Sequence, residues 1–206
     1  MNEAFSSYEQ KIENEKMPAG KKKVIIASLH LFANNGFHAT TTAEIAKAAG
    51  VSEGTIYKYF RSKEDLMNKL LLPILENIKN GFFFQIEKYQ TLDELIDFAI
   101  VNRLQFLQNN FELIKLIMQE LLTNQDIYPT FQKILNGKDG ILTSIKNMQQ
   151  HYPEINQNLS PEQIIRIIVA PVITLSLQEN LFGIKSKNTT DDLKLVKKQI
   201  IAGLAQ

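Results

Sequence analysis

Residues 40–63 read TTTAEIAKAAGVSEGTIYKYFRSK, and this stretch predicts two short helices joined by a tight turn. Thr41 and Glu44 stand in the S/T-x-x-E relation of a capping box, so we expect the first helix to begin after Thr41. Gly50 ends that helix, because glycine adopts the left-handed conformation of a helix stop at little cost. Ser52 is then the N-cap of a second helix. The pattern is that of a helix-turn-helix.

The second helix has one apolar face and one face that suits contact with DNA. Ile56 and Phe60 lie four positions apart and are expected to point inward. The outward positions hold Glu53, Thr55, Tyr57, Lys58 and Tyr59. Lysine and tyrosine side chains reach phosphates, and threonine or tyrosine can touch thymine methyl groups. DNA binding is therefore the favoured interpretation, and a plain helical hairpin with exposed tyrosines is the alternative.

The run GFHATTTAEIAKAAGVSEGTIYKYFRSKEDL, residues 36–66, resembles the DNA-binding signature of the tetracycline-repressor-like (TetR) family of bacterial regulators. The resemblance covers about the first third of the chain, and the remainder agrees only in length and helical character. The matching residues are Gly36, Phe37, Thr40, Ile45, Ala46, Gly50, Val51, Ser52, Gly54, Thr55, Tyr57, Tyr59, Phe60, Lys63 and Leu66. The resemblance implies a dimeric, ligand-responsive transcription regulator, usually a repressor.

Two positions depart from the pattern of that family. Thr42 stands where an apolar residue is commoner, and Glu53 stands where Lys, Arg or Pro is often found. The second departure puts an acid near the DNA groove. Glu53 either accepts a hydrogen bond from cytosine N4 or serves the helix dipole and faces away.

Charge is concentrated in the region of the helix-turn-helix, although the whole chain has a net charge of only +1. Residues 18–72 contain eight Lys or Arg and four Asp or Glu, a balance of +4, so the rest of the chain has −3. Lys21 to Lys23 open the first helix of this basic module and are either a solvated helix start or phosphate contacts. We predict DNA contacts from Lys22, Thr40, Thr41, Ser52, Glu53, Gly54, Thr55, Tyr57, Lys58, Tyr59 and Lys63.

The 206 residues, 44% of them hydrophobic, predict an all-α protein with a sizeable core. We expect a flexible polar arm over 1–17, a three-helix DNA-binding domain over 18–65, and a helical effector-binding and dimerisation domain over 66–206. The long helix after Ser62 contains Pro73 and belongs to both domains. Residues 126–150 keep one apolar phase, which predicts a single weakened helix. Thr189 and Asp192 predict the start of the last helix.

The second domain offers candidate effector and dimer residues. A hydrophobic effector would contact apolar and aromatic side chains, although each could equally be core: Phe83, Phe84, Phe106, Phe111, Met118, Tyr128 and Phe131. The last two helices are apolar on more than one face, which favours burial against a partner subunit. The expected interface residues are Ile164, Ile168, Leu175, Val196 and Ile200. A two-fold dimer implies a pseudo-palindromic operator on double-stranded DNA.

The sequence gives little support to other function classes. Without cysteine there are no disulfides and no thiolate zinc sites. The three histidines form no metal-ligand motif with each other or with carboxylates, and no nucleophile or phosphate-binding motif appears, so we expect neither a metal, nor a cofactor, nor an enzyme. No signal peptide or membrane-spanning stretch appears, which predicts a cytoplasmic protein away from the membrane. The alternatives are a constitutive helix-turn-helix protein without a ligand and an all-helical enzyme.

Overall fold

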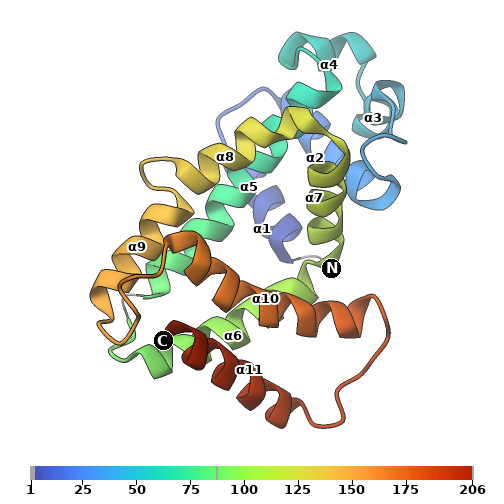
Figure 1. Ribbon diagram of the computed structural model, residues 1–206. Coiled ribbons are helices and arrows are strands. Elements are labelled where there is room, and N and C mark those ends of the chain that lie inside the picture. Colours follow the sequence, from blue (N-terminus) through green and yellow to red (C-terminus); the bar gives the residue numbers. More distant parts are fainter. Residues whose placement is uncertain (1–2, 87, 206) are drawn as a thin grey trace. The chain divides into compact units, whose positions relative to one another are not determined.

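A computed structural model describes residues 3–86 and 88–205, which form eleven α-helices and one 3₁₀-helix and no strand (Figure 1). The predicted all-α fold is confirmed. None of the described helices is both long enough and apolar enough to cross a bilayer. The elements are α1 (Glu3–Asn14), α2 (Ala19–Asn35), α3 (Thr42–Ala49), α4 (Glu53–Tyr59), α5 (Lys63–Ile86), α6 (Leu92–Asn109), α7 (Phe111–Thr123), η1 (Gln125–Ile127), α8 (Tyr128–Asn136), α9 (Ile141–His151), α10 (Pro161–Asn180) and α11 (Thr189–Leu204).

Local hydrogen bonds form the helix-turn-helix as the sequence predicts. The Glu44 amide donates to Thr41 Oγ1 at 3.2 Å, and the Thr41 amide donates to Glu44 Oε2 at 2.8 Å, which completes the capping box. Gly50 has φ 63° and ψ 38°, the left-handed region that favours glycine. Ile45 and Ile56 are fully buried, so α3 and α4 have a fixed inner face. The outer face of α4 is fixed as a consequence.

The expected flexible arm contains an ordered helix, α1, that packs on α2. Tyr8 and Ile12 lie one turn apart on α1, and both are buried. His30 Nε2 lies 2.7 Å from Glu9 Oε1, which adds a polar contact between the two helices. The polar composition of the segment concealed this two-residue apolar stripe, and its burial explains why the segment is folded.

Packing divides the chain into two compact units. Unit 1 consists of the residues up to 78 together with 109–132, and unit 2 consists of 79–108 together with the residues from 133 onward. In unit 1, α7 packs against α2 and adds Leu113, Leu116 and Ile117 to the core of the helix-turn-helix region. This packing extends unit 1 beyond the predicted DNA-binding domain. The functional division at residue 65 stays a prediction.

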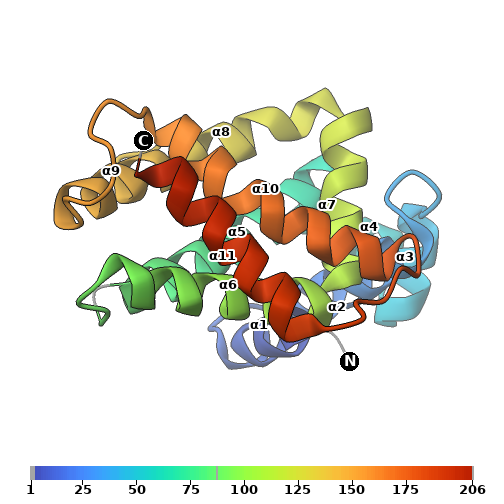
Figure 2. The ribbon, with the colours of Figure 1, turned by 60° about the horizontal axis from the view of Figure 1, so that its bottom comes forward.

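Unit 2 has its own core, formed by α6, α9, α10 and α11. Helices α10 and α11 lie side by side, as Figure 2 shows. The Tyr152 hydroxyl donates to Tyr89 O at 2.7 Å. This hydrogen bond connects the residue after α9 to the segment between α5 and α6. Ser160 and Gln163 form the capping box that starts α10. The start of α10 is therefore fixed by local hydrogen bonds.

The prediction of one helix over 126–150 is wrong, because α8 ends at Asn136 and α9 starts at Ile141. A Cβ at Gly140 would lie 2.4 Å from Leu135 O, so the intervening turn accommodates only glycine there. The matching apolar phase on both sides of the turn gave no sign of this break. The last helix is capped by Asn188 rather than Thr189, since the Thr190 amide donates to Asn188 Oδ1 at 3.1 Å.

Candidate nucleic-acid interface and effector cavities

The outward face of α4 includes the exposed side chains of Tyr57 and Lys58. Tyr57 is 54% exposed and Lys58 is also exposed, whereas Ile56 between them and the core is fully buried. Thr55 and Tyr59 are half-buried because they face the start of α2, where a Cβ on Gly20 would lie 3.3 Å from Thr55 Cγ2. Of these four side chains on α4, Tyr57 and Lys58 are therefore more accessible to DNA than Thr55 and Tyr59.

The two departures from the family pattern meet in space. Thr42 Oγ1 donates to Glu53 Oε1, which connects the first residue of α3 to the first residue of α4. Tyr57 Oη lies 3.4 Å from the same Thr42 hydroxyl. Glu53 is exposed, and its other carboxylate oxygen, Oε2, has no hydrogen-bond partner among the described residues. The carboxylate is thus held in place with one acceptor oxygen open to solvent.

Thr40 and Lys63 have interactions inside the protein. Thr40 is fully buried, and its hydroxyl donates to Gly36 O at 2.8 Å and Leu31 O at 3.3 Å. Lys63 Nζ donates to Phe37 O and to Thr40 O, each at 2.9 Å, and lies 4.3 Å from the Phe37 ring centroid. Both side chains hold the loop that precedes α3, and their contacts with DNA stay a prediction.

The remaining predicted DNA contacts lie around this face. Thr41 is exposed, and its bonds to Glu44 lower the pKa of that carboxyl below its ordinary value. Ser52 and Gly54 are exposed at the start of α4, and Ser52 Oγ lies 3.0 Å from the hydroxyl oxygen of Thr55. Lys22 Nζ donates to Glu13 O at 2.5 Å, so it connects α2 to the end of α1. The sequence gave no sign of that contact, because α1 was not expected.

The predicted effector residues are distributed over both units. Phe111 and Phe131 are half-buried in unit 1, where Phe131 packs on the core, and Met118 and Tyr128 are 50% and 44% exposed in the same unit. In unit 2, Phe84 is 75% exposed, which removes it from any cavity wall there. Phe83 and Phe106 of the predicted set line cavities of unit 2.

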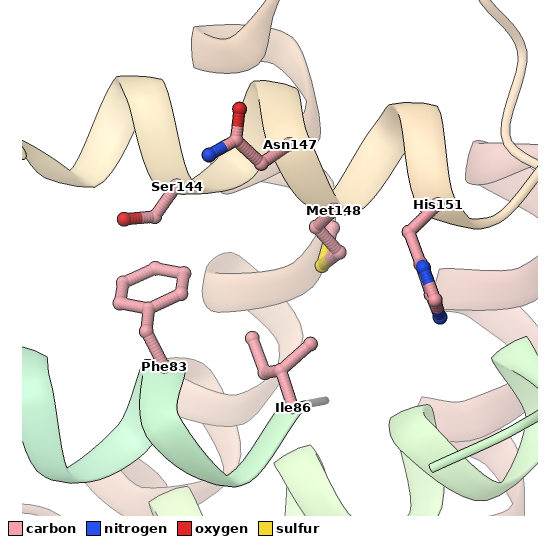
Figure 3. A pocket seen from close by; sticks show the side chains of 6 residues that line it. All are labelled: Phe83, Ile86, Ser144, Asn147, Met148 and His151. Atoms are coloured by element: carbon pink, nitrogen blue, oxygen red, sulfur yellow. The ribbon is translucent and has the colours of Figure 1, made fainter. Parts of the chain in front are cut away.

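The cavity beside Phe83 has a volume of about 250 Å³. Phe83 and Ile86 on α5 face Ser144, Asn147, Met148 and His151 on α9 (Figure 3). Its wall therefore combines apolar groups with hydroxyl, amide and imidazole groups. Of this lining, only Phe83 was predicted from the sequence. The prediction rested on aromatic side chains, and the residues that α9 contributes are mostly polar.

A second cavity, of about 180 Å³, lies between α6 and α10. Its lining is apolar apart from one arginine and consists of Arg103, Phe106, Leu107, Ile168, Val169, Val172 and Ile173. The Arg103 guanidinium lies 4.3 Å from the Phe82 ring centroid and 5.1 Å from that of Phe106. Burial lowers the pKa of Arg103 to about 10. Arg103 was not among the predicted residues, although it is the single basic residue of α6.

The predicted dimer residues divide into two groups. Ile164, Val196 and Ile200 are buried in the core of unit 2, so they stabilise the subunit itself and are not available to a partner. Ile168 and Leu175 are half-buried. Large apolar side chains are nevertheless exposed on α11 and in the segment after α10: Leu181 57%, Phe182 69%, Ile184 59% and Leu195 54%.

No group of three or more His, Asp or Glu residues in the described part of the chain is arranged to hold a metal ion.

The sequence profile described as "Bacterial regulatory proteins, tetR family" matches residues 24–70, which include α3, α4 and the start of α5. This match covers the same capped helices and glycine turn that define the candidate DNA-binding face.

Two curated proteins illustrate the similarity of the sequence. The "Fatty acid metabolism regulator protein" of Bacillus subtilis (strain 168) is 31% identical over 126 residues, which cover 59% of this chain and 65% of that protein. The "HTH-type transcriptional regulator UidR" of Escherichia coli (strain K12) is 25% identical over 73% of this chain and 74% of its own. The alignment with the first of these thus spans slightly less than two thirds of its length.

Solved structures extend the likeness of the fold to almost the whole chain. FadR from Bacillus subtilis, solved in complex with stearoyl-CoA, has a TM-score of 0.65 at 23% identity and covers 89% of this chain and 97% of its own. Salmonella enterica GusR has a TM-score of 0.70 at 19% identity and covers 93% and 98%. The profile match and the helix-turn-helix geometry together show that residues 24–70 form a DNA-binding domain of the tetR family of bacterial regulatory proteins, and the two solved structures, each below 25% identity, show that the fold of the whole chain is shared.

Proposed function

We propose that this regulator is a homodimeric repressor that a small hydrophobic effector releases from a pseudo-palindromic DNA operator. The outward face of α4 is the observation that supports the proposal most. Tyr57 and Lys58 are exposed on a helix whose inner face is fixed by the buried Ile56. A helix presented in this way fits the major groove, where lysine and tyrosine reach phosphates and base edges. An operator in bacterial DNA also implies a cytoplasmic protein.

Glu53 adds sequence preference to this face. Its Oε1 accepts from Thr42, and its exposed Oε2 is free among the described residues to accept from the N4 amino group of cytosine. An unconstrained acid at this place would mainly repel phosphates. A carboxylate held by Thr42 instead favours one base and disfavours others, so Thr42 is a positioning residue for Glu53.

Dimerisation is supported by the apolar side chains that unit 2 leaves exposed. Leu195 on α11 and Leu181 and Phe182 after α10 are each more than half exposed. Several large apolar side chains left exposed on one unit favour an interface. Two copies related by a two-fold axis would place their α4 helices about 34–36 Å apart, one turn of DNA, or a multiple of it.

The hydrophobic effector is supported by the apolar walls of unit 2 and by a relative. Both cavities described above contain phenylalanine side chains, and FadR from Bacillus subtilis binds stearoyl-CoA. Helix α5 runs without interruption from Lys63 in unit 1 to Phe83 and Ile86 beside the cavity in unit 2. A ligand that shifts this helix alters the placement of the DNA-binding faces, by at most its differential affinity for the two arrangements.

Fluorescence anisotropy on an operator obtained by selection from randomised DNA tests the proposal. Tyr57→Ala and Lys58→Ala should each weaken binding by about 1–3 kcal/mol if they contact bases. The matched control is Lys47→Ala, because Lys47 is exposed on α3 and lies outside the predicted contact set. Operator affinity that is unchanged in both α4 variants would contradict the assignment of this face. Binding that no apolar compound weakens would instead indicate a constitutive regulator.

A further inference from the structure

Arg103 has a positive charge that no carboxylate of the described chain neutralises. Its guanidinium lies over the Phe82 and Phe106 rings at 4.3 and 5.1 Å, and its Nε and Nη2 both donate to Asn102 Oδ1, at 3.0 and 2.5 Å. The described residues contain no ion pair that involves it, whereas Lys197, on α11 of the same unit, has two aspartate partners at 2.8 Å. The side chain is half-buried and its hydrogen-bond partner is neutral.

A charge in such surroundings is ordinarily paired. Removal of a guanidinium from water is unfavourable unless a counter-ion or several acceptors replace the lost hydration. Contacts with two aromatic rings recover part of that free energy but leave most of the five N–H donors without an anionic acceptor. The arrangement is therefore poised to accept a negatively charged group from outside the chain.

The cavity next to Arg103 provides the rest of a binding site. Phe106 and Leu107 on α6 face Ile168 and Val172 on α10, and Arg103 is the single charged residue of this lining. The volume of about 180 Å³ holds about six water-sized groups, at about 30 Å³ each. A short unbranched apolar segment fits this space, and the charge of Arg103 in its wall favours a ligand that also has an anionic group.

We propose that the cavity between α6 and α10 binds the anionic head and adjoining apolar segment of an amphiphilic effector, with the Arg103 guanidinium as anchor of the head. This inference rests on the proposed function only where it treats the bound molecule as the effector. Arginine presents paired N–H donors to a carboxylate or phosphate, and the apolar walls take the first carbons of the chain. The charge distinguishes such a ligand from neutral apolar compounds of the same size.

The test compares ligand charge and residue charge in one design. Isothermal titration of the full-length protein with octanoate, octyl phosphate and octan-1-ol measures how much the head contributes, and the first two distinguish a carboxylate head from a phosphate head. Arg103→Met keeps the apolar stem and removes the charge. Arg166→Met is the matched control, because Arg166 is exposed on α10 and outside the cavity lining.

We expect the parent protein to bind at least one of the two anions about 10- to 100-fold more tightly than octan-1-ol, because charge-assisted hydrogen bonds form only with the anion. Arg103→Met should remove this preference while binding of octan-1-ol is kept, and Arg166→Met should keep it. A merely structural arginine would change the affinity for all three compounds together. Equal affinity for anion and alcohol in the parent, the same preference in Arg103→Met, or no binding of any compound would overturn the proposal.

The fate of the operator complex separates this site from the proposed function. If an anion binds through Arg103 but does not weaken operator binding, the site stands and effector-driven release by that ligand fails. If the operator complex is released by neutral apolar compounds whose affinity Arg103→Met does not change, regulation stands and the site fails. Each result therefore points to one of the two claims.

Discussion

Replacement of Lys63 by alanine separates a structural lysine from a phosphate-binding one. Lys63 Nζ donates to Phe37 O and Thr40 O at 2.9 Å each and lies over the Phe37 ring. A hydrogen bond to a charged group contributes about 1.5–3 kcal/mol to stability. Lys63 is only half-buried, so its two hydrogen bonds together contribute less than twice that amount. We therefore expect Lys63→Ala to destabilise the protein by about 2–3 kcal/mol, a fall in Tm of about 4–12 °C for a chain of this size.

Two measurements on the same variants check this reasoning. Urea denaturation gives the change in the free energy of unfolding, and operator binding at several salt concentrations gives the salt slope. Lys58→Ala is the matched comparison, because Lys58 is exposed and its one contact is the Tyr59 ring at 5.6 Å. The Lys58→Ala variant should keep the free energy of unfolding within about 0.5 kcal/mol of the parent value and should lower the salt slope of operator binding by about one. Parent-like stability of Lys63→Ala together with a salt slope lowered by one would refute the internal role and restore the phosphate contact.

Three further perturbations follow from the structure. Glu53→Gln should relax the preference for cytosine at one position of each half-site by about 1–3 kcal/mol, and an unchanged selection from randomised DNA would show that Glu53 serves only the helix dipole. Leu195→Glu should shift the protein toward monomer in sedimentation at micromolar concentration with an unchanged circular dichroism spectrum, because this side chain is 54% exposed on the subunit; a dimer that persists would place the interface elsewhere. Burial raises the pKa of Tyr8 to about 12, so the folded state retains a proton that the unfolded state loses near pH 10. Stability should therefore fall by roughly 1–3 kcal/mol from pH 10 through pH 12, and Tyr8→Phe should remove that part of the fall; an identical pH profile in the variant would show that Tyr8 does not cause it.

The helix boundaries around the helix-turn-helix could be predicted from sequence because their causes are local. Thr41 and Glu44 satisfy each other's backbone amides within four residues, and Gly50 alone adopts the turn at φ 63°. Ser160 and Gln163 act in the same way at the start of α10. The all-α fold and the outward Tyr57 and Lys58 follow from such signals, since a capped helix with one apolar face has only one way to point its other face.

Tertiary packing decided what local signals leave open. Ile164 and Val196 have the same apolar character as a dimer contact, and only the packing of α10 against α11 shows that they belong to the core of the subunit. The sequence predicts a phosphate contact for Lys63, and only the structure shows the two carbonyl groups, more than twenty residues away, to which its amine donates. The charge of Arg103 is visible in the sequence, but its lack of an acidic partner depends on which helices surround it. Residue type and spacing fix which groups a helix presents, whereas burial and pairing are properties of the contacts between distant segments, and these determine whether a side chain stabilises the fold or is available to a ligand.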